Sequence, residues 1–321
     1  MTERERISER VLDLTGWERH DNYRILTDTS NWMDILRGDI IRLGGRDFVV
    51  KGNQHETRFG IADQPKMWVF NTLELDTGEQ KIIKTVFNED FHVHVGVFRI
   101  HCYRSPEKET YVLDITRGDN RFMQGYMMMD DKENKVRVID FIKGPTHFNY
   151  IYTIDKPHEQ YFHEDLPQLM RNLVGSFEAI DFLHQHGTCH GDIRNDHIII
   201  DTETGEYKWI DFDLNQHVSD YDVWSLGNLV NYVVGKGITS FQQVMRNREI
   251  SDEVKQSLTQ ADASAFFEYR IMNLEKLYPY IPPKLNRILK HFTYKPEEYY
   301  SSCRELIDDI CDMLDTEFAG N

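Results

Sequence analysis

Apolar and polar residues alternate with the two-residue period of β-strands from about residue 39 to residue 98. The run 40–50 has Gly-Gly at its centre, and the run 68–87 has Asp-Thr-Gly in the same place. Such turns between alternating runs are typical of β-hairpins. Residues 1–37 instead predict a polar helix followed by an irregular stretch. Ser105 with proline after it predicts the start of a short helix.

The period changes to that of an α-helix after Gly144. Just before it, residues 136–142 form one more strand pattern. Apolar residues then recur at helical spacing over 166–183, and further helical patterns cover 221–234 and much of 241–315. The chain is therefore expected to have a β-rich first part and a helical second part.

Composition narrows the function classes. The chain has 321 residues, 40% apolar and 12% aromatic, enough for one large or two moderate globular domains. A net charge of −17 argues against constitutive binding to nucleic acid or anionic lipid. The four cysteines are dispersed, which suits a reducing compartment. The start of the chain does not read as a signal peptide, and no apolar run predicts membrane insertion, so we expect a cytoplasmic protein.

The most informative stretch is His190-Gly-Asp-Ile-Arg-Asn-Asp-His197, followed by Asp211-Phe-Asp213. Between them, two short β-rich runs joined by a Gly-containing turn predict a hairpin. A hairpin brings its ends together, so Asp192 and Asp211 are expected to face one small volume. Phosphoryl transfer needs one carboxylate to orient the attacking hydroxyl and another to hold a divalent cation. The alternative is a pair of carboxylates that cap the hairpin ends.

This stretch resembles the catalytic loop and the Asp-Phe-Gly segment of the protein-kinase superfamily. From about residue 39 to 315 the chain is similar to a eukaryotic-type (Ser/Thr) protein kinase domain, as a divergent bacterial-type member. The resemblance implies an α+β, bilobal fold with an N-terminal extension (1–38), a β-rich N-lobe (39–142) and an α-helical C-lobe (143–321). ATP would sit between the lobes.

The resemblance also implies roles for single residues. Lys84 would hold the ATP phosphates and pair with Glu109, with Glu107 as a competing partner. Asp192 would accept the hydroxyl proton, and Arg194 would neutralise the transferred phosphoryl group. The remaining implied positions are Ile139 and Ile142 beside the adenine, Gly52 and Gly60 in a phosphate-covering or ordinary strand-to-strand loop, and Asp211, His197 and Asp213 at the metal.

Three features depart from the kinase pattern. His197 stands where the family has an asparagine that binds a second Mg²⁺, so the site is expected either to shift towards Mn²⁺ or to use His197 only to hydrogen-bond the loop. Asp213 stands where the family has a glycine, which predicts a less mobile segment. It also resembles the Asp-Phe-Asp of bacterial kinases for lipopolysaccharide core sugars. The resemblance also implies that Asp222, in Asp222-Val-Trp-Ser-Leu-Gly227, is a buried structural residue that hydrogen-bonds the catalytic-loop backbone. Eight residues separate Asp213 from Asp222, too few for an activation segment.

The leading expectation is an ATP-dependent kinase that uses Mg²⁺, or Mn²⁺, and phosphorylates a Ser or Thr hydroxyl. Two alternatives remain open. One is a small-molecule or sugar kinase of the same fold, which the missing activation segment favours. The other is a pseudokinase that binds nucleotide or a partner protein, which His197 and the poor glycine loop favour. The expected partners are ATP and a protein or small-molecule hydroxyl acceptor, without nucleic acid.

Overall fold

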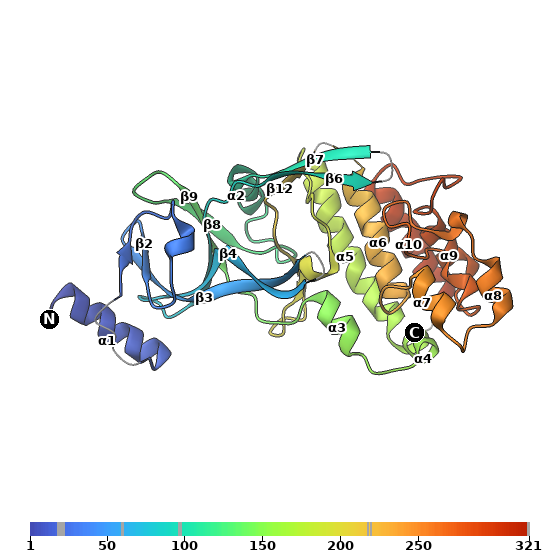
Figure 1. Ribbon diagram of the computed structural model, residues 1–321, viewed down its shortest axis with the longest axis horizontal. Coiled ribbons are helices and arrows are strands. Elements are labelled where there is room, and N and C mark those ends of the chain that lie inside the picture. Colours follow the sequence, from blue (N-terminus) through green and yellow to red (C-terminus); the bar gives the residue numbers. More distant parts are fainter. Residues whose placement is uncertain (18–22, 59–60, 96–97, 217, 219, 320–321) are drawn as a thin grey trace. The chain divides into compact units, whose positions relative to one another are not determined.

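The computed structural model describes residues 1–17, 23–58, 61–95, 98–216, 218 and 220–319. The chain is a mixed α/β protein (Figure 1), and its contacts separate into two compact units. Unit 1 comprises Met1–Glu89, Arg104–Asp119 and Met123–Ile142. Unit 2 comprises Asp90–Tyr103, Asn120–Phe122 and Lys143–Asn321.

Unit 1 is built on a seven-stranded sheet with the strand order β1-β2-β3-β4-β5-β9-β8. Its neighbouring strands are antiparallel except for β1 and β2, which are parallel. One face buries an apolar cluster that includes Phe48, Phe70 and Val138. The strands are β1 (Ile25–Leu26), β2 (Ile40–Leu43), β3 (Arg46–Arg58), β4 (Ile61–Glu74), β5 (Gln80–Lys84), β8 (Gly125–Met129) and β9 (Lys135–Asp140).

The hairpin turns of unit 1 have the backbone geometry that their sequence predicts. Gly44 and Gly45, between β2 and β3, have φ of 54° and 82°. Gly78, between β4 and β5, has φ of 76°. Because glycine adopts positive φ without a Cβ penalty, these residues allow the chain to reverse tightly. Both predicted hairpins are confirmed.

Two helices complete unit 1, apart from the short 3₁₀ turn Trp32–Asp34. Helix α1 (Glu3–Thr15) begins with a capping box between Thr2 and Glu5, and it packs on the sheet through buried Ile7. Helix α2 (Pro106–Ile115) begins at Ser105, whose hydroxyl accepts a hydrogen bond from the backbone N–H of Lys108 at 3.2 Å. The predicted helix start at Ser105 is therefore confirmed.

Unit 2 is mainly helical. In Figure 1, helix α5 runs beside α6 and α10. On α6, a Cβ atom at Gly227 would lie 2.3 Å from the ring of Phe292, so glycine lets that ring pack directly on the helix backbone. The helices are α3 (His147–Thr153), α4 (His158–Glu164), α5 (Leu166–Gln185), α6 (Tyr221–Val234), α7 (Phe241–Arg246), α8 (Asp252–Ser257), α9 (Pro283–Lys290) and α10 (Cys303–Glu317), with 3₁₀ turns at Asn195–His197, Gln260–Asp262 and Leu274–Lys276.

Unit 2 also contains two small sheets. Strands β10 (Ile198–Ile200) and β11 (Tyr207–Trp209) form the predicted antiparallel hairpin. The second sheet has the order β12-β7-β6, from β6 (Asp90–Val95), β7 (Phe98–Arg104) and β12 (Leu214–Gln216). The sequence indicated a strand near β6 but not this sheet, because β12 is far from β6 and β7 along the chain. None of the helices in the described part of the chain combines the length and apolar character that a membrane span needs.

Candidate functional site

In unit 1, a buried carboxylate joins two cationic side chains. The Lys84 ammonium donates a hydrogen bond to Oε1 of Glu109 at 2.6 Å, and Nε of Arg137 donates to Oε2 at 3.0 Å. Lys84 and Arg137 are paired residues on the adjacent strands β5 and β9, and Glu109 projects from α2. All three side chains are at least nine-tenths buried. We call Lys84, Glu109 and Arg137 the charged triad.

Glu107, the competing glutamate on α2, has a different partner. Its carboxylate accepts a hydrogen bond from Lys135 at 2.7 Å and is 62% exposed. An exposed pair of this kind contributes little to stability because water screens it. The structure therefore gives Lys84 the buried Glu109 as its partner. The sequence analysis did not identify Arg137. The signal that could have identified it is an arginine between apolar residues in the strand pattern of residues 136–142.

The other predicted nucleotide-binding positions of unit 1 are dispersed. Gly52 is not in a loop: it lies inside β3, at a shift in register against β4, and its φ of 149° favours glycine. Gly60 lies outside the described residues. Ile139 is buried in β9, whereas Ile142 is half-buried in the segment after that strand.

In unit 2, main-chain bonds close the ends of the β10–β11 hairpin. The backbone N–H of Ile210 donates to the carbonyl of His197 at 3.0 Å. The indole of Trp209 donates to the carbonyl of Ser176 on α5 at 2.8 Å, which ties β11 to the helix. On the other side, a Cβ atom at Gly144 would lie 1.9 Å from the carbonyl oxygen of Ile200. The hairpin is thus fixed on both sides, and its ends meet as predicted.

Asp222 at the start of α6 supports the loop before the hairpin. Its fully buried carboxylate accepts hydrogen bonds from the backbone N–H groups of His190 (2.7 Å) and Gly191 (2.8 Å) and from the His184 ring (3.0 Å). Burial alone would raise the pKa of Asp222, but the hydrogen bond and charge of His184 outweigh it and lower the pKa. The structural role that the sequence predicted for Asp222 is confirmed.

Two ring nitrogens organise the backbone of Asp192. Its N–H donates to Nδ1 of His190 at 3.2 Å, and its carbonyl accepts a hydrogen bond from Nδ1 of His197 at 2.7 Å. The Asp192 side chain remains 22% exposed. The carboxylate can therefore reach a ligand in solvent while its backbone is held.

His197 and Asp211 are buried beside Asp192. Nε2 of His197 lies 3.5 Å from Oδ2 of Asp211, and the two side chains are 4% and 7% exposed. Asp211 also has a φ of 71°, an uncommon value for a residue other than glycine. Strained backbone of this kind is concentrated at ligand-binding sites. At Asp213, where the sequence predicted a less mobile segment, the backbone does not adopt a positive φ.

One donor atom each from Asp192, His197 and Asp211 lie within 4.8 Å of one another. We call these three residues the donor cluster. Two carboxylates and an imidazole are a suitable ligand set for a divalent cation. The fit is supported by Nε2 of His197, a buried polar atom without a hydrogen-bond partner that faces Asp211.

Asp213, the third predicted metal ligand, is buried next to the donor cluster. One of its carboxylate oxygens lies within 4.8 Å of one from Asp211. Phe212 between them is buried against the rings of Phe122 and His190, with centroids 5.8 Å and 4.8 Å away. The buried ring anchors the segment that carries both carboxylates.

Arg194 is paired within its own loop. Its guanidinium donates two hydrogen bonds to the Asp196 carboxylate, at 3.0 Å and 2.8 Å. Burial would lower the pKa of Arg194, but the charges of Asp192 and Asp196 outweigh it and raise the pKa. Asp196 was missed by the sequence analysis, although its position two residues after Arg194 was visible.

Strand β12 of the three-stranded sheet directly follows the segment Asp211–Asp213. Leu214, at the start of β12, packs with Ile100 and Cys102 of β7. Burial raises the pKa of the Cys102 thiol, and the charge of Asp192 adds to that effect. Strand β7 therefore packs against the segment that follows Asp213, and its Cys102 lies within electrostatic range of Asp192.

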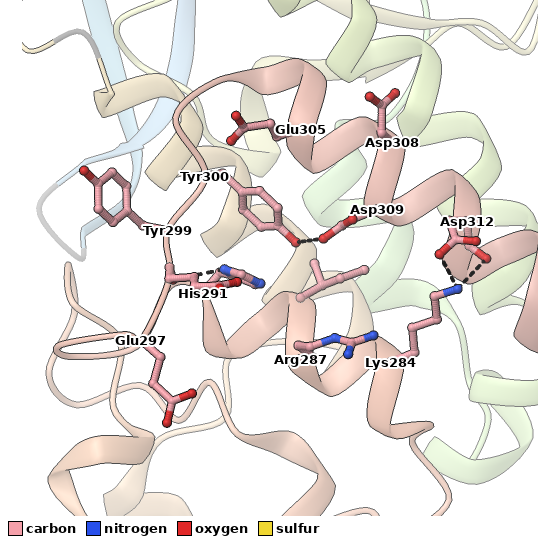
Figure 2. Close-up of a pocket in the computed structure, with 12 residues that line it drawn as sticks. Lys284, Arg287, His291, Glu297, Tyr299, Tyr300, Glu305, Asp308, Asp309 and Asp312 are labelled. Atoms are coloured by element: carbon pink, nitrogen blue, oxygen red, sulfur yellow. Dashed lines mark hydrogen bonds and ion pairs between the residues drawn. The ribbon is translucent and has the colours of Figure 1, made fainter.

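A separate cavity of about 820 Å³ lies between α9, the segment 297–300 and α10. Figure 2 shows Asp312 of α10 facing Lys284 of α9, and Asp309 of α10 facing Tyr300. Several of its polar groups pair with one another: Lys284 with Asp312, and the Tyr300 hydroxyl with Asp309 at 2.7 Å. None of the residues of the donor cluster lines this cavity.

The chain has partial similarity to serine/threonine protein kinases. It is 26% identical over 147 residues to CBL-interacting serine/threonine-protein kinase 15 of Arabidopsis thaliana, covering 46% of this chain and 31% of that one. It is 28% identical to probable serine/threonine-protein kinase fnkE of Dictyostelium discoideum (28% and 7% covered) and 33% identical to serine/threonine-protein kinase pim-2 of Danio rerio (24% and 27% covered).

Each match spans less than a third of the relative's length. No protein-family model matches the chain. The matches support a distant relationship to the kinase-like superfamily and kinase-like function at that level.

Proposed function

We propose that this chain is an ATP-dependent phosphotransferase with a bilobal, protein-kinase-like fold. The observation that carries the proposal is the donor cluster, in which a partly exposed carboxylate lies beside a buried carboxylate and imidazole. The similarity to serine/threonine kinases supports the same reaction class. The domain boundaries after residues 38 and 142 stay a prediction.

In the proposed reaction, Asp192 accepts the proton of the acceptor hydroxyl as its oxygen attacks the γ-phosphorus. The bond from that phosphorus to the bridging oxygen breaks, and ADP leaves. Asp211 and His197 would hold a divalent cation, which when bound neutralises charge on the phosphates. Lys84, held by its hydrogen bond to Glu109, would bind the phosphates. Arg194, held by Asp196, would contribute positive charge near Asp192.

The leading acceptor is a Ser or Thr hydroxyl of a protein, as in the relatives' names. A small-molecule acceptor is the second candidate, and a specific observation favours it. Within the eight residues between Asp213 and Asp222, residues 214–216 form strand β12 and are paired with β7. That part of the segment is therefore engaged by the chain itself rather than open to a peptide.

The test is transfer of labelled γ-phosphate from ATP, with Mg²⁺ and with Mn²⁺, to generic proteins and to a panel of sugars and other small alcohols. Asp192→Asn should reduce transfer by on the order of 10³-fold, because it removes the base, while thermal shift still detects ATP binding. Asp308→Asn makes the same change at an exposed position of α10 and should leave transfer unchanged.

Wild-type transfer by Asp192→Asn would contradict the assignment of the base. ATP binding without transfer to any acceptor would favour the pseudokinase. Transfer to small alcohols but never to protein would favour the second candidate.

A further inference from the structure

When His197 is neutral, its surroundings select one of its two tautomers. Its Nδ1 lies 2.7 Å from the backbone carbonyl of Asp192, and a carbonyl only accepts hydrogen bonds. Nδ1 therefore carries the proton, and Nε2 presents a lone pair. An imidazole in this state resembles the asparagine amide of the kinase pattern in having a donor nitrogen and a separate acceptor atom.

The Nε2 lone pair faces a negative group. Oδ2 of Asp211 is 3.5 Å away, beyond the usual range of an N–H···O hydrogen bond. Both atoms are taken out of water, since the side chains are at least nine-tenths buried. Two acceptors that face one another in a buried site repel unless a positive group lies between them. Two ligands about 2.1 Å from one ion lie at most about 4.2 Å apart, so the observed separation fits a shared cation.

The chemistry of the donor selects among cations. Mg²⁺ strongly prefers oxygen ligands and near-ideal octahedral geometry. Imidazole nitrogen suits first-row transition ions, whose affinity for mixed nitrogen and oxygen sites rises from Mn²⁺ onwards. We propose that Nε2 of His197 is an inner-sphere metal ligand, together with Asp211, and that this nitrogen makes the site favour Mn²⁺ and later transition ions over Mg²⁺. The inference deepens the proposed function by naming its metal class, and rests on that function only for its effect on turnover.

Direct spectroscopy tests the ligand without any turnover. Electron spin-echo spectra of the 321-residue chain with MnCl₂ should show coupling of the metal to a histidine nitrogen. Incorporation of ¹⁵N-histidine should change that coupling. Bound Mn²⁺ without nitrogen coupling, or no Mn²⁺ binding, would overturn the inference, and this wild-type measurement does not depend on whether any variant folds.

Selectivity provides the second readout. In His197→Asn an oxygen replaces the nitrogen donor, so the ratio of the Mg²⁺ to the Mn²⁺ dissociation constant should fall on the order of tenfold. The nitrogen coupling should disappear in the same variant. His186→Asn, the same change at an exposed histidine after α5, should retain both. An unchanged ratio in His197→Asn would reject the role of the nitrogen in selecting the metal.

The two proposals fail differently. If nitrogen-coupled Mn²⁺ binds but no acceptor is phosphorylated, the phosphotransferase proposal fails and the metal assignment stands. If transfer occurs equally well with both ions and the spectrum shows no nitrogen, the metal assignment fails and the phosphotransferase stands.

Discussion

The charged triad of unit 1 and the donor cluster of unit 2 both consist of buried ionisable groups, but they satisfy those groups in different ways. In the triad, both oxygens of Glu109 accept hydrogen bonds from cations, at 2.6 Å and 3.0 Å. In the cluster, His197 and Asp211 face one another at 3.5 Å with a ring nitrogen that makes no hydrogen bond. In the first arrangement the carboxylate is satisfied within the chain, whereas in the second we propose that a cation bridges the two groups. The comparison therefore separates a group whose carboxylate is satisfied within the chain from one that leaves a buried ring nitrogen available to a ligand.

The formal charges point the same way. The triad has two cations for one carboxylate, which suits a role close to anionic phosphate. Around the donor cluster, the described residues of unit 2 place four carboxylates, those of Asp192, Asp196, Asp211 and Asp213, near the guanidinium of Arg194. That ratio suits a cation. A metal–nucleotide substrate carries charges of both signs, so the charges of each group agree with the role given to it in the proposed function.

The largest predicted effect comes from breaking the triad. Glu109→Gln keeps the shape but removes the charge that compensates two buried cations, so the free energy of unfolding should fall by about 3–5 kcal/mol. Urea unfolding followed by circular dichroism measures it. Glu107→Gln, the same change at the exposed neighbour on α2, should have an effect under about 1 kcal/mol. Equal effects of the two variants would show that the buried network contributes no special stability.

The features of the fold and of the candidate site that the sequence predicted are those whose signals lie close together along the chain. The β10–β11 hairpin, the Ser105 cap of α2 and the buried role of Asp222 were predicted because turn residues, caps and motif spacing lie within a few residues of one another. The pairing of β12 with β7 was not predicted, since it joins segments more than a hundred residues apart.

The missed features of the site are also explained by tertiary context. Arg137 reads as one polar residue in a strand until the fold places it beside Glu109. The positive φ of Asp211 was not predicted, because no glycine marks that position; it falls where the chain leaves β11. Residue identity thus predicted which groups have the chemistry, but not which backbone carries the strain.

We expect low pH to destabilise unit 2 more than unit 1. Burial lowers the pKa of His147 to about 4, outweighing the hydrogen bond to Asn195, whereas an unfolded histidine has its ordinary pKa near 6.5. Between these values the unfolded state binds the proton and the folded state does not. Stability is therefore complete above about pH 6.5 and falls by up to about 1.4 kcal/mol per pH unit as the pH drops towards 4.

Urea unfolding at several pH values between 4.5 and 7 measures this slope. His147→Gln removes this titrating group, so the slope should decrease by the contribution of one proton. A variant with the wild-type slope would contradict the assignment of this pH dependence to His147. Burial lowers the pKa of His158 in the same direction. In the described part of unit 1, His55 is the histidine present and is exposed, so acid loss of structure should begin in unit 2.

The smallest predicted effect tests whether the position of the β10–β11 hairpin determines Mn²⁺ affinity as well as stability. In Gly144→Ala the new methyl group would meet the carbonyl of Ile200 at 1.9 Å, which forces β10 to move. The unfolding free energy should fall by about 1–3 kcal/mol. Because β10 begins next to His197, Mn²⁺ affinity should fall as well. Gly175→Ala, in α5 with nothing within 4 Å of its Cβ, should instead raise stability by about 0.5–1 kcal/mol and leave Mn²⁺ affinity unchanged. If Gly144→Ala lowers stability but not Mn²⁺ affinity, the cluster does not depend on the position of the hairpin, and its geometry must be set by the Asp222-supported loop alone.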